Sequence, residues 1–593
     1  MPSPSLKDLV DEWLLLDPNP ETRNEIQTLW NRCDIDELEK RLRTRIDFGT
    51  AGLRGRMEAG WSRMNDLIIL QTSQGLSEYI LQHVEMARDR GLVVGYDHRH
   101  HSEHWAILTA NIFVAKGIKV YLLRGFNHTP MVPFAVKKLN AACGVMITAS
   151  HNPKQDNGYK VYWENAVQIV PPHDKGISIA IQTNLRSQPA VEDASSSELL
   201  LDLTEHLRSE YFEYLRNSVT NRDINIGTIV KFVNTSMHGV GDYFVKEGFT
   251  VFGFPPYTPV AKQQSPDPEF STVPFPNPEE KGALDLAIET AEREGADYVL
   301  AQDPDADRFT AAQKGPTGEW ILFTGDQLGS IFAARVLEAY KASGQPVNKL
   351  AMVASTVSSK MIETMAEVEG FKFVECLTGF KFIGNTALRL VADGFTVPLG
   401  YEEAIGFMFG SQIRDKDGVA ATMIFAELCA ELRVKGMTVN DYLQELYQRY
   451  GYFQTKNSYF ICNDPKVTDE IFSHIRRWGS SGSTGTTYPD TLAELPINRI
   501  IDLTTGYDSG NPPAYLPSLP LSSGHMVQFR ASSCSNEINL VLTLRTSGTE
   551  PKIKIYLEGN GRDSKLVDQQ LSKAITDISE KWIRADKYSL KMG

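Results

Sequence analysis

The run DPDADR, residues 303–308, places a carboxylate at every second position. Carboxylate oxygens are the hard ligands that Mg²⁺ prefers, commonly with a phosphate oxygen completing the shell. A calcium loop of the EF-hand type is excluded, because its sixth position would be Gly but is Arg308, and its twelfth would be Glu but is Lys314. A solvated acidic turn remains the alternative. The predicted Mg²⁺ ligands are Asp303, Asp305 and Asp307.

A hydroxyl, an imidazole and an amide follow the apolar run 143–148, at Ser150, His151 and Asn152. Ser150 could act as a nucleophile or carry a phosphoryl group, and His151 could orient the hydroxyl or bond phosphate oxygens. A Ser-His-Asp hydrolase is the competing interpretation, but no GxSxG elbow surrounds Ser150, and a His adjacent in sequence rarely faces its neighbour. The remaining alternative is a serine that caps or turns the chain.

A third cluster, RTSGTEPK at residues 545–552, combines a guanidinium, hydroxyls and a glycine in one short turn. These groups can cradle a phosphate through bidentate, hydroxyl and backbone N–H donors. It is not a P-loop, because no GxxxxGK precedes it, and an ordinary hairpin is equally open. Two weaker patterns are the glutamate pair of GYEEAIGF, residues 400–407, and Arg54 in the glycine-rich FGTAGLRG, residues 48–55.

The elements that must carry these loops alternate between short β-rich runs and helical patterns, which is typical of α/β proteins. The pattern restarts twice, which predicts three related α/β domains. The predicted strands are 91–97, 117–123, 143–148, 229–239, 249–254, 296–302, 349–356 and 371–376, with a helix over 104–116.

The last 140 or so residues differ, because the alternating run 538–559 predicts two antiparallel strands around a loop. This indicates a fourth, α+β domain. The Pro-dense run 255–280 predicts an ordered extended loop that lies against a neighbour, and 186–198 and 479–490 have linker composition. The predicted domains are 1–215, 216–328, 329–450 and 451–593.

Composition excludes several classes of protein. The 593 residues carry a net charge of −14 with no long basic block, which argues against a nucleic-acid partner. No run of 18 uncharged apolar residues predicts a membrane span, and the acidic N-terminus argues against a signal peptide. Six scattered cysteines without a CxxC pair fit a reducing, cytoplasmic location. An anionic substrate would need positive groups gathered locally at its site.

Taken together, TASHNP, DPDADR, GYEEAIG and RTSGTEP occur in the order of the four signature loops of the α-D-phosphohexomutase superfamily, which this chain resembles over residues 48–558. The motifs GTAGLRG, LTGFKFIG and IRDKDG fit its secondary patterns. The resemblance implies four domains around a central cleft and a phosphoserine enzyme. It also implies Mg²⁺ and a sugar bisphosphate, of glucose or a pentose, as activator, with sugar phosphates as substrates.

The resemblance also assigns roles by position. Ser150 carries the phosphoryl group and contributes an oxygen to Mg²⁺, while Asp303, Asp305 and Asp307 hold the ion. The other implied catalytic residues are His151, Lys160, Arg308 and Lys416, with Lys160 and Lys416 as candidates for proton transfer. The implied substrate-binding residues are Arg54, Thr378, Gly379, Glu402, Ala404, Arg545, Ser547, Gly548, Thr549 and Lys554. A lysine base at neutral pH needs its pKa lowered from about 10.4.

Within the superfamily, ASHNPKQDNGYKVYW and PDPEFSTVPFPNPEE are similar to the phosphoglucomutase-2-like, or phosphopentomutase, branch. In the superfamily, the loop that contacts the sugar commonly reads GEES. The corresponding loop here, GYEEAIG, has Tyr401 in place of the Gly and Ala404 in place of the Ser. Loss of that hydroxyl favours a pentose phosphate over a hexose phosphate. The predicted activity is phosphopentomutase with phosphoglucomutase activity. A glucose 1,6-bisphosphate synthase and a silent sugar-phosphate-binding scaffold are the alternatives. We expect a monomer or weak dimer.

Overall fold

The computed structural model describes residues 4–49, 52–186, 193–479, 487–535, 537–547 and 551–593. The chain divides into two compact units, which are treated in turn. The first contains residues 1–328 and 379–439, and the second contains residues 329–378 and 440–593.

The first unit opens with helices α1 (Leu6–Leu16), α2 (Pro20–Asn31) and α3 (Ile35–Leu42), followed by a six-stranded sheet in the order β1-β5-β4-β2-β3-β6. Its strands are β1 (Leu53–Arg56), β2 (Leu92–Tyr96), β3 (Val120–Leu122), β4 (Cys143–Ile147), β5 (Asp156–Trp163) and β6 (Leu200–Leu201). Strands β4, β2, β3 and β6 run parallel, whereas β5 is antiparallel to both β4 and β1. The predicted strands in this region are confirmed.

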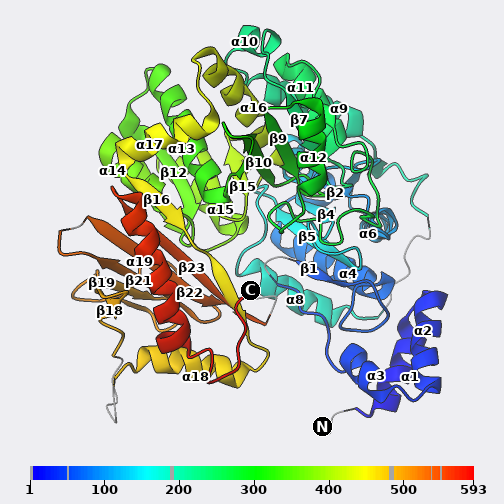
Figure 1. Ribbon diagram of the computed structural model, residues 1–593. Helices are drawn as coiled ribbons and strands as arrows, with labels where there is room; N and C mark the ends of the chain where they lie inside the picture. Colours follow the sequence, from blue (N-terminus) through cyan, green and yellow to red (C-terminus); the bar gives the residue numbers. More distant parts are fainter. Residues whose placement is uncertain (1–3, 50–51, 187–192, 480–486, 536, 548–550) are drawn as a thin grey trace. The chain divides into compact units, whose positions relative to one another are not determined.

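Helices cover this sheet. They are α4 (Asp66–His83), α5 (Ala87–Arg90), α6 (Ser102–Ala115), α7 (Met131–Leu139), α8 (His173–Thr183) and α9 (Thr204–Arg216). Helix α4 packs against α6 and α8 (Figure 1). Helix α7 packs on strands β2 and β4, where Gly95 and Gly144 leave room for Val132. The predicted helix over 104–116 is α6. The strand ends therefore stay fixed between two helical layers.

A second, five-stranded sheet has the order β11-β10-β9-β7-β8. Its strands are β7 (Phe232–Thr235), β8 (Thr258–Pro259), β9 (Tyr298–Gln302), β10 (Phe309–Lys314) and β11 (Trp320–Leu322), and its helices are α10 (Arg222–Ile226), α11 (Gly241–Phe252) and α12 (Asp285–Glu294). Strand β7 is parallel to β8 and β9, and β10 is antiparallel to β9 and β11. The DPDADR loop connects β9 to β10.

The predicted strand 249–254 is wrong. Residues 249–252 form the last turn of α11, which ends at Gly253 with φ of 85°. Phe249, Val251 and Phe252 are buried, and a short, fully buried apolar run has the same pattern in a helix as in a strand.

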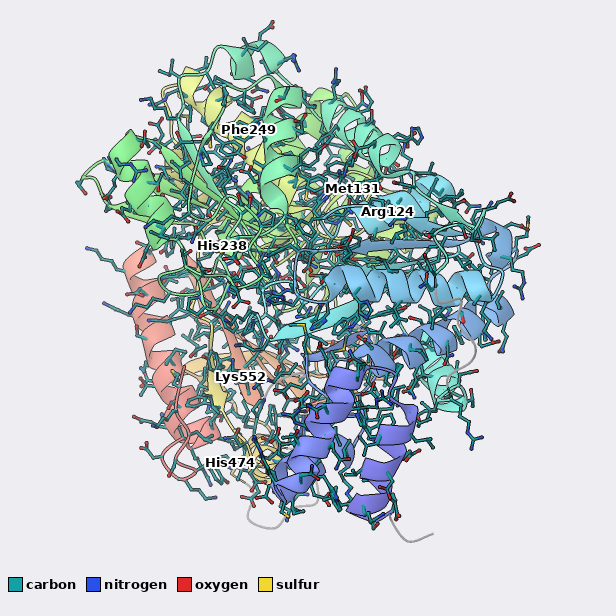
Figure 2. All side chains as sticks on the ribbon, turned by 90° about the vertical axis from the view of Figure 1, so that its right-hand side faces the viewer. Arg124, Met131, His238, Phe249, His474 and Lys552 are labelled. Atoms are coloured by element: carbon teal, nitrogen blue, oxygen red, sulfur yellow. The ribbon has the colours of Figure 1, made fainter. Side chains whose placement is uncertain are left out.

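The Pro-dense run 255–280 contains no helix, as predicted, and lies against its neighbours. His238, which follows β7 (labelled in Figure 2), has its Nε2 2.7 Å from the hydroxyl of Thr272 in this loop. Glu269 of the same loop pairs with His100 and Lys154 of the first sheet's loops. The loop therefore ties the second sheet to the first.

The first unit also contains the antiparallel pair β14 (Thr396–Glu402) and β15 (Gly406–Phe409), with helices α15 (Phe380–Ala392) and α16 (Gly418–Val434). The turn between β14 and β15 is fastened to β10. The N–H of Phe309 donates to the carbonyl of Ile405 (3.0 Å), and Arg308 forms an antiparallel bridge with Gly406. The glutamate loop and the DPDADR loop are thus held together through backbone bonds.

The second unit combines a parallel pair, β12 (Leu350–Ser355) and β13 (Lys372–Cys376), with a C-terminal antiparallel sheet in the order β16-β23-β22-β21-β19-β18. That sheet consists of β16 (Tyr452–Thr455), β17 (Ser458–Ile461), β18 (Thr491–Leu492), β19 (Leu495–Asp502), β20 (Tyr507–Asp508), β21 (Met526–Ser532), β22 (Ile538–Thr546) and β23 (Lys552–Gly561). The helices of this unit are α13 (Gly325–Ala342), which begins in the first unit, α14 (Met361–Glu369), α17 (Val439–Tyr450), α18 (Pro465–Arg476) and α19 (Ser564–Asp577), with short turns η1 (Val347–Lys349) and η2 (Ile578–Ile583). The predicted hairpin over 538–559 is formed by β22 and β23.

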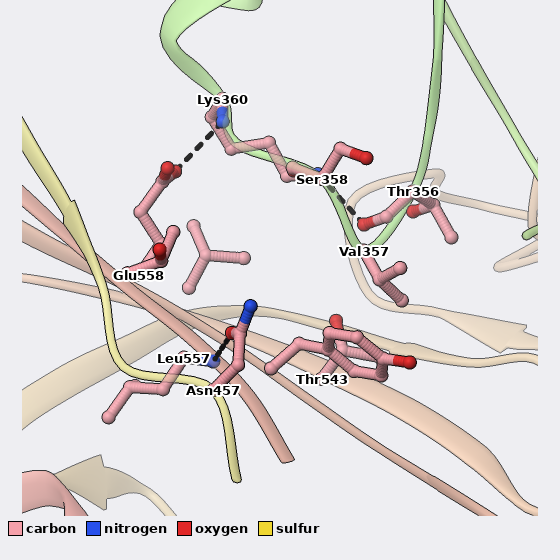
Figure 3. A pocket seen from close by; sticks show the side chains of 11 residues that line it. Thr356, Val357, Ser358, Lys360, Asn457, Thr543, Leu557 and Glu558 are labelled. Carbon is pink, nitrogen blue, oxygen red and sulfur yellow. Dashed lines mark hydrogen bonds between the residues drawn. The ribbon is translucent and has the colours of Figure 1, made fainter. Parts of the chain in front are cut away.

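Strand β23 is fastened to the start of α14. Glu558 of β23 accepts a hydrogen bond from the N–H of Lys360 (2.8 Å) (Figure 3). Gln528 of β21 donates to the carbonyl of Thr356 (3.2 Å). A cavity of about 10 Å³ lies among these residues, room for about one water molecule. Glu558 lies on the same strand as Lys554 of the predicted phosphate-binding loop.

The predicted architecture of α/β domains with mixed sheets and a C-terminal antiparallel domain is confirmed. Among the helices of the described ranges, none combines the length and apolar character needed to cross a bilayer. The six cysteines are free thiols. The predicted linkers 186–198 and 479–490 lie partly outside the described residues.

We expect Gly325→Ala to destabilise the first unit. A Cβ at Gly325 would lie 1.9 Å from the carbonyl oxygen of Glu403 and 2.8 Å from the amide nitrogen of Ile405, both of them backbone atoms that cannot turn aside. Overpacking of this kind costs about 1–3 kcal/mol, which calorimetry would record as a lower unfolding temperature. Gly227→Ala is the matched control, because its Cβ would meet only the Asp223 carbonyl at 3.4 Å. Equal unfolding temperatures for both variants would contradict the expectation.

Candidate active site

Ser150 lies just beyond the carboxyl end of β4, in a turn where its own φ is 54°. This left-handed conformation is unusual for a residue other than glycine and turns the chain back on itself. The Ser150 hydroxyl donates to Asp303 Oδ2 (2.8 Å), and His151 Nδ1 lies 3.2 Å from Ser150 Oγ. His151 therefore contacts the serine hydroxyl, although a histidine adjacent in sequence rarely faces its neighbour well enough to serve as its base. Ser150 itself is only 3% exposed.

The three aspartates of the DPDADR loop lie together and are buried. Each offers an oxygen within 4.8 Å of the other two. Burial beside two other carboxylates raises the pKa of Asp303, while the pKa of Asp305 is lowered despite its burial because Lys160 lies beside it. Among the described residues, Asp305 Oδ1 and Asp307 Oδ1 have no hydrogen-bond partner. Unsatisfied, buried carboxylate oxygens that face one another fit a hard divalent cation.

Two ammonium groups and one backbone N–H contact the carboxylates. Lys160 Nζ donates to Asp305 Oδ2 (2.7 Å) and Asp307 Oδ2 (3.1 Å), and Lys416 Nζ lies 3.3 Å from Asp307 Oδ2. The backbone N–H of Arg308 donates to Asp303 Oδ1 (3.0 Å). The structure thus brings Lys160 from β5 and Lys416 from the IRDKDG loop to one carboxylate.

The pKa values of both lysines are displaced upward. Burial alone would lower the pKa of Lys160, but Asp305 and Asp307 outweigh it and raise the pKa. Asp307 and Asp415 likewise raise the pKa of Lys416 against the effect of burial. This direction is opposite to the lowering that a general base needs, because the carboxylates attract the protonated form more strongly than burial disfavours it.

The glutamate loop ends β14, where Glu402 is buried and 7% exposed. Burial raises the pKa of Glu402, and Lys416 partly offsets that effect. Ala404 follows in the turn. Tyr401 points elsewhere, because its side chain is fully buried and its hydroxyl lies 3.4 Å from Asp326 Oδ1. Of the two differences from the GEES pattern, Tyr401 therefore lies in the core. Ala404 is the difference that changes the loop itself.

Two other predicted substrate-binding positions precede α15. Gly379 is the N-cap of α15 with φ of 111°, a conformation that favours glycine. The hydroxyl of Thr378 is buried without a hydrogen-bond partner among the described residues. Arg54, on β1, lies beside the serine turn and donates to Asn152 Oδ1 (3.0 Å).

The phosphate-type loop belongs to the second unit. The β22–β23 register places Arg545 directly opposite Lys554, and Arg545 Nη2 donates to the Tyr556 hydroxyl (3.1 Å). Ser547 donates its N–H to the Lys552 carbonyl and, with Lys552, lines a cavity of about 450 Å³. Gly548 and Thr549 lie outside the described residues. The strand pairing therefore brings the guanidinium and the ammonium of the predicted cradle to one hairpin.

Sequence reasoning missed Thr129, whose hydroxyl donates to Asp305 Oδ2 (2.5 Å) and whose N–H donates to the Asp305 carbonyl (2.9 Å). A signal was present in the sequence. Polar clusters follow all three neighbouring parallel strands, at 97–99 after β2, 127–129 after β3 and 148–151 after β4. Because the carboxyl ends of parallel strands meet at one edge of a sheet, these clusters had to converge.

Comparison with known proteins identifies the fold and its relatives. The chain matches the family models "Phosphoglucomutase/phosphomannomutase, alpha/beta/alpha domain" I over residues 45–187, II over 209–317 and III over 324–450. It is 42% identical to the phosphopentomutase of Homo sapiens, covering 98% of this chain and 96% of that one. It is 40% identical to the human glucose 1,6-bisphosphate synthase, covering 99% and 96%. The open form of pp63/parafusin, a phosphoglucomutase from Paramecium, shares the fold with a TM-score of 0.65 at 18% identity, covering 92% and 95%.

We expect Asp307→Asn to weaken divalent metal binding. The substitution removes the charge of one carboxylate whose free oxygen faces the other two, and even outer-shell changes typically cost about 10- to 100-fold in metal affinity. Titration calorimetry with Mg²⁺, or paramagnetic titration with Mn²⁺, would measure the loss. Asp508→Asn is the matched control, since Asp508 is a buried carboxylate paired with Arg499 in the second unit. Unchanged affinity in Asp307→Asn would show that the cluster holds no metal.

Proposed function

We propose, for a chain that belongs to the phosphoglucomutase/phosphomannomutase family, that it is a phosphopentomutase with phosphoglucomutase activity. It moves a phosphoryl group between the 1-position and the 5- or 6-position of a sugar phosphate. A phosphoserine at residue 150 and a sugar bisphosphate are the intermediates, and the bisphosphate also primes the enzyme.

One observation carries the proposal. The Ser150 hydroxyl donates directly to Asp303, a member of the buried carboxylate cluster. A hydrolytic serine is instead activated by a base and faces an oxyanion hole, whereas a serine beside a divalent-metal site is placed for phosphoryl transfer. The surrounding Lys160, Lys416 and Arg308 supply the positive charge that a transferring phosphoryl group requires.

The first transfer breaks the bond between phosphorus and Ser150 Oγ and forms a bond from phosphorus to the free sugar hydroxyl. The hydroxyl proton passes to the neutral amine of a lysine, either Lys160 or Lys416, and the ammonium so formed returns a proton to the departing Ser150 oxygen, so that protons and charge balance. The bisphosphate then presents its other phosphoryl group, and the same steps in reverse restore the phosphoserine. The first half-reaction leaves Ser150 without its phosphoryl group and the second returns one, so the full cycle conserves the phosphoryl group of the enzyme.

Asp303, Asp305 and Asp307 would hold Mg²⁺, with an oxygen of the phosphoserine as a further ligand. When bound, Mg²⁺ supplies two positive charges that polarise the phosphoryl oxygens and compensate the carboxylates that raise the pKa of the two lysines. Arg308 remains protonated, because the carboxylates raise the pKa of Arg308 despite its burial. Its guanidinium is therefore available to neutralise the moving group.

Binding of the sugar and of the phosphate that does not react is assigned to separate groups. Glu402, assisted by Thr378, Gly379 and Ala404, accepts from sugar hydroxyls, because an ionised carboxylate is an acceptor only. Arg545, Ser547, Gly548, Thr549 and Lys554 hold the second phosphate, and Arg54 contacts the bisphosphate. The support is the pairing of Arg545 with Lys554 across the hairpin.

A pentose preference is supported by the alanine at position 404, which offers no hydroxyl to a hexose. It is also supported by the full-length similarity to phosphopentomutases. The similarity to glucose 1,6-bisphosphate synthase is nearly as high, so a synthase is the second candidate. A synthase takes its phosphoryl group from a separate donor and releases the bisphosphate. Interconversion of ribose 1-phosphate and ribose 5-phosphate without any added donor, beyond a catalytic amount of bisphosphate, would identify the mutase.

We expect Ser150→Ala to lose at least about 10³-fold in turnover, because the group that carries the phosphoryl is removed. Intact-mass spectrometry should find one phosphoryl group on the parent protein, discharged by excess sugar monophosphate, and none on the variant. Ser77→Ala is the matched control, since Ser77 is a buried serine of α4 that bonds only its own helix at Gln74. Full turnover by the Ser150→Ala variant would contradict the phosphoserine mechanism.

We expect Ala404→Ser to shift preference toward hexose phosphates. One added hydrogen bond is worth about 0.5–1.5 kcal/mol, which corresponds to a two- to tenfold rise in the kcat/KM ratio of glucose 1-phosphate over ribose 1-phosphate. Tyr401→Phe should leave this ratio unchanged, because the Tyr401 hydroxyl faces the core. A ratio that moves in Tyr401→Phe but not in Ala404→Ser would contradict this account of specificity.

A further inference from the structure

We propose that Arg99 is a positioning residue that holds the backbone of the serine turn, residues 149–156, in the conformation from which Ser150 reaches the carboxylate cluster. The proposal rests on Ser150 being the phosphoryl carrier. Arg99 lies in the HRHH run after β2, and its side chain is fully buried.

Four hydrogen bonds join this one guanidinium to the serine turn. Arg99 Nη2 donates to the carbonyl oxygens of Ser150 (2.5 Å) and Asn152 (2.6 Å). Arg99 Nη1 donates to the carbonyl oxygens of Pro153 (2.9 Å) and Asp156 (3.1 Å). Every one of these acceptors is a backbone group, so the guanidinium fixes the path of the chain and does not depend on which side chains the turn carries.

The serine turn needs such a clamp. Four of its carbonyls meet the buried Arg99 side chain, and buried carbonyls without donors cost free energy. Within the turn, backbone bonds run only from Asn152 to Ala149 and from Asp156 to Pro153. A guanidinium offers five donors in a rigid fork, whereas a lysine offers a point charge that cannot span four carbonyls.

Arg99 is itself held from two sides. Its Nε lies 3.4 Å from Asp97 Oδ2, and Asp97 Oδ1 accepts from the Arg99 N–H and the Ser102 hydroxyl. The ring of Phe270, from the Pro-dense loop 255–280, lies 4.9 Å from the guanidinium carbon. A planar cation held between a carboxylate and an aromatic face has little freedom to turn, so its four carbonyl bonds have fixed directions.

A purely structural arginine would be expected to stabilise the fold and nothing more. A positioning residue predicts in addition that its loss frees the serine turn and slows phosphoryl transfer without weakening substrate binding. Misplacing a reacting group by about 1 Å can cost about 10²-fold in rate. The two roles therefore differ in local mobility, in the balance of kcat and KM, and in rescue by a small guanidinium.

The test compares Arg99→Lys and Arg99→Ala with Arg41→Ala. Arg41 is the matched control, because it is also a buried arginine, paired with Glu25, Glu37 and Glu58, but in the N-terminal helices. For each protein, amide hydrogen exchange of peptides covering 148–158 is measured by mass spectrometry, together with kcat and KM on ribose 1-phosphate. The Arg99→Ala protein is also assayed with added methylguanidinium.

We expect both Arg99 variants to exchange the Asn152 and Asp156 amides at least about tenfold faster, and to lose about 10- to 100-fold in kcat with KM within threefold of the parent. Methylguanidinium should restore part of the kcat of Arg99→Ala only. Should Arg99→Ala not fold, Arg99→Lys alone decides, because it keeps the stem and the charge but not the fork.

Unchanged exchange in residues 148–158 of Arg99→Lys, with kcat within twofold of the parent, would overturn the proposal. An equal loss of kcat and of exchange protection over residues 148–158 in Arg41→Ala would also overturn the proposal. The exchange measurement needs no substrate, so it still reports on the clamp if the parent protein turns over no sugar phosphate. In that case the proposed function fails, and the hold of Arg99 on the turn is judged separately.

Discussion

Three buried carboxylates within 4.8 Å of one another form the constraint on which the first unit depends. Like charges at this separation repel strongly away from water, so the cluster can persist only if positive groups and hydrogen-bond donors converge on it. Lys160, Lys416 and the N–H of Arg308 meet that requirement in part. The oxygens that have no hydrogen-bond partner among the described residues leave a site of negative charge that fits a divalent cation.

This requirement explains why loops from distant parts of the sequence meet at the cluster. Three of the contacting residues come from the first sheet. Thr129 follows β3, Ser150 follows β4, and Lys160 lies on the antiparallel strand β5. Lys416 reaches the cluster from the IRDKDG loop after β15. At the start of α16, the N–H of Gly418 donates to the Ala306 carbonyl (3.2 Å). Each contact offsets charge or satisfies a carbonyl, so the geometry of catalysis and the packing of the loops have the same cause.

Sequence reasoning found the residues whose chemistry is visible in a short motif and missed those that act through backbone or context. The carboxylate spacing in DPDADR and the alternation in 538–559 were sufficient to predict a metal-type cluster and a hairpin. Arg99 bonds only carbonyls, which no side-chain pattern records. The direction of the Tyr401 side chain and the upward pKa shift of Lys160 depend on neighbours more than 70 residues away, and the upward pKa shift of Lys416 depends on distant Asp307 as well as adjacent Asp415.

The division between chemistry and specificity follows from the energies involved. Neutralising a transferring phosphoryl group needs several charges at fixed positions, and under the proposed function the buried cations of the first unit would supply them. Choosing between a pentose and a hexose needs far less, since 1.4 kcal/mol changes a preference tenfold. One hydrogen bond from a hydroxyl in the turn after Glu402 would contribute a free energy of that order. The chain is 42% and 40% identical to relatives whose names give different activities, so overall identity does not decide between those activities, whereas a contact of this energy to the sugar is enough to change a substrate preference.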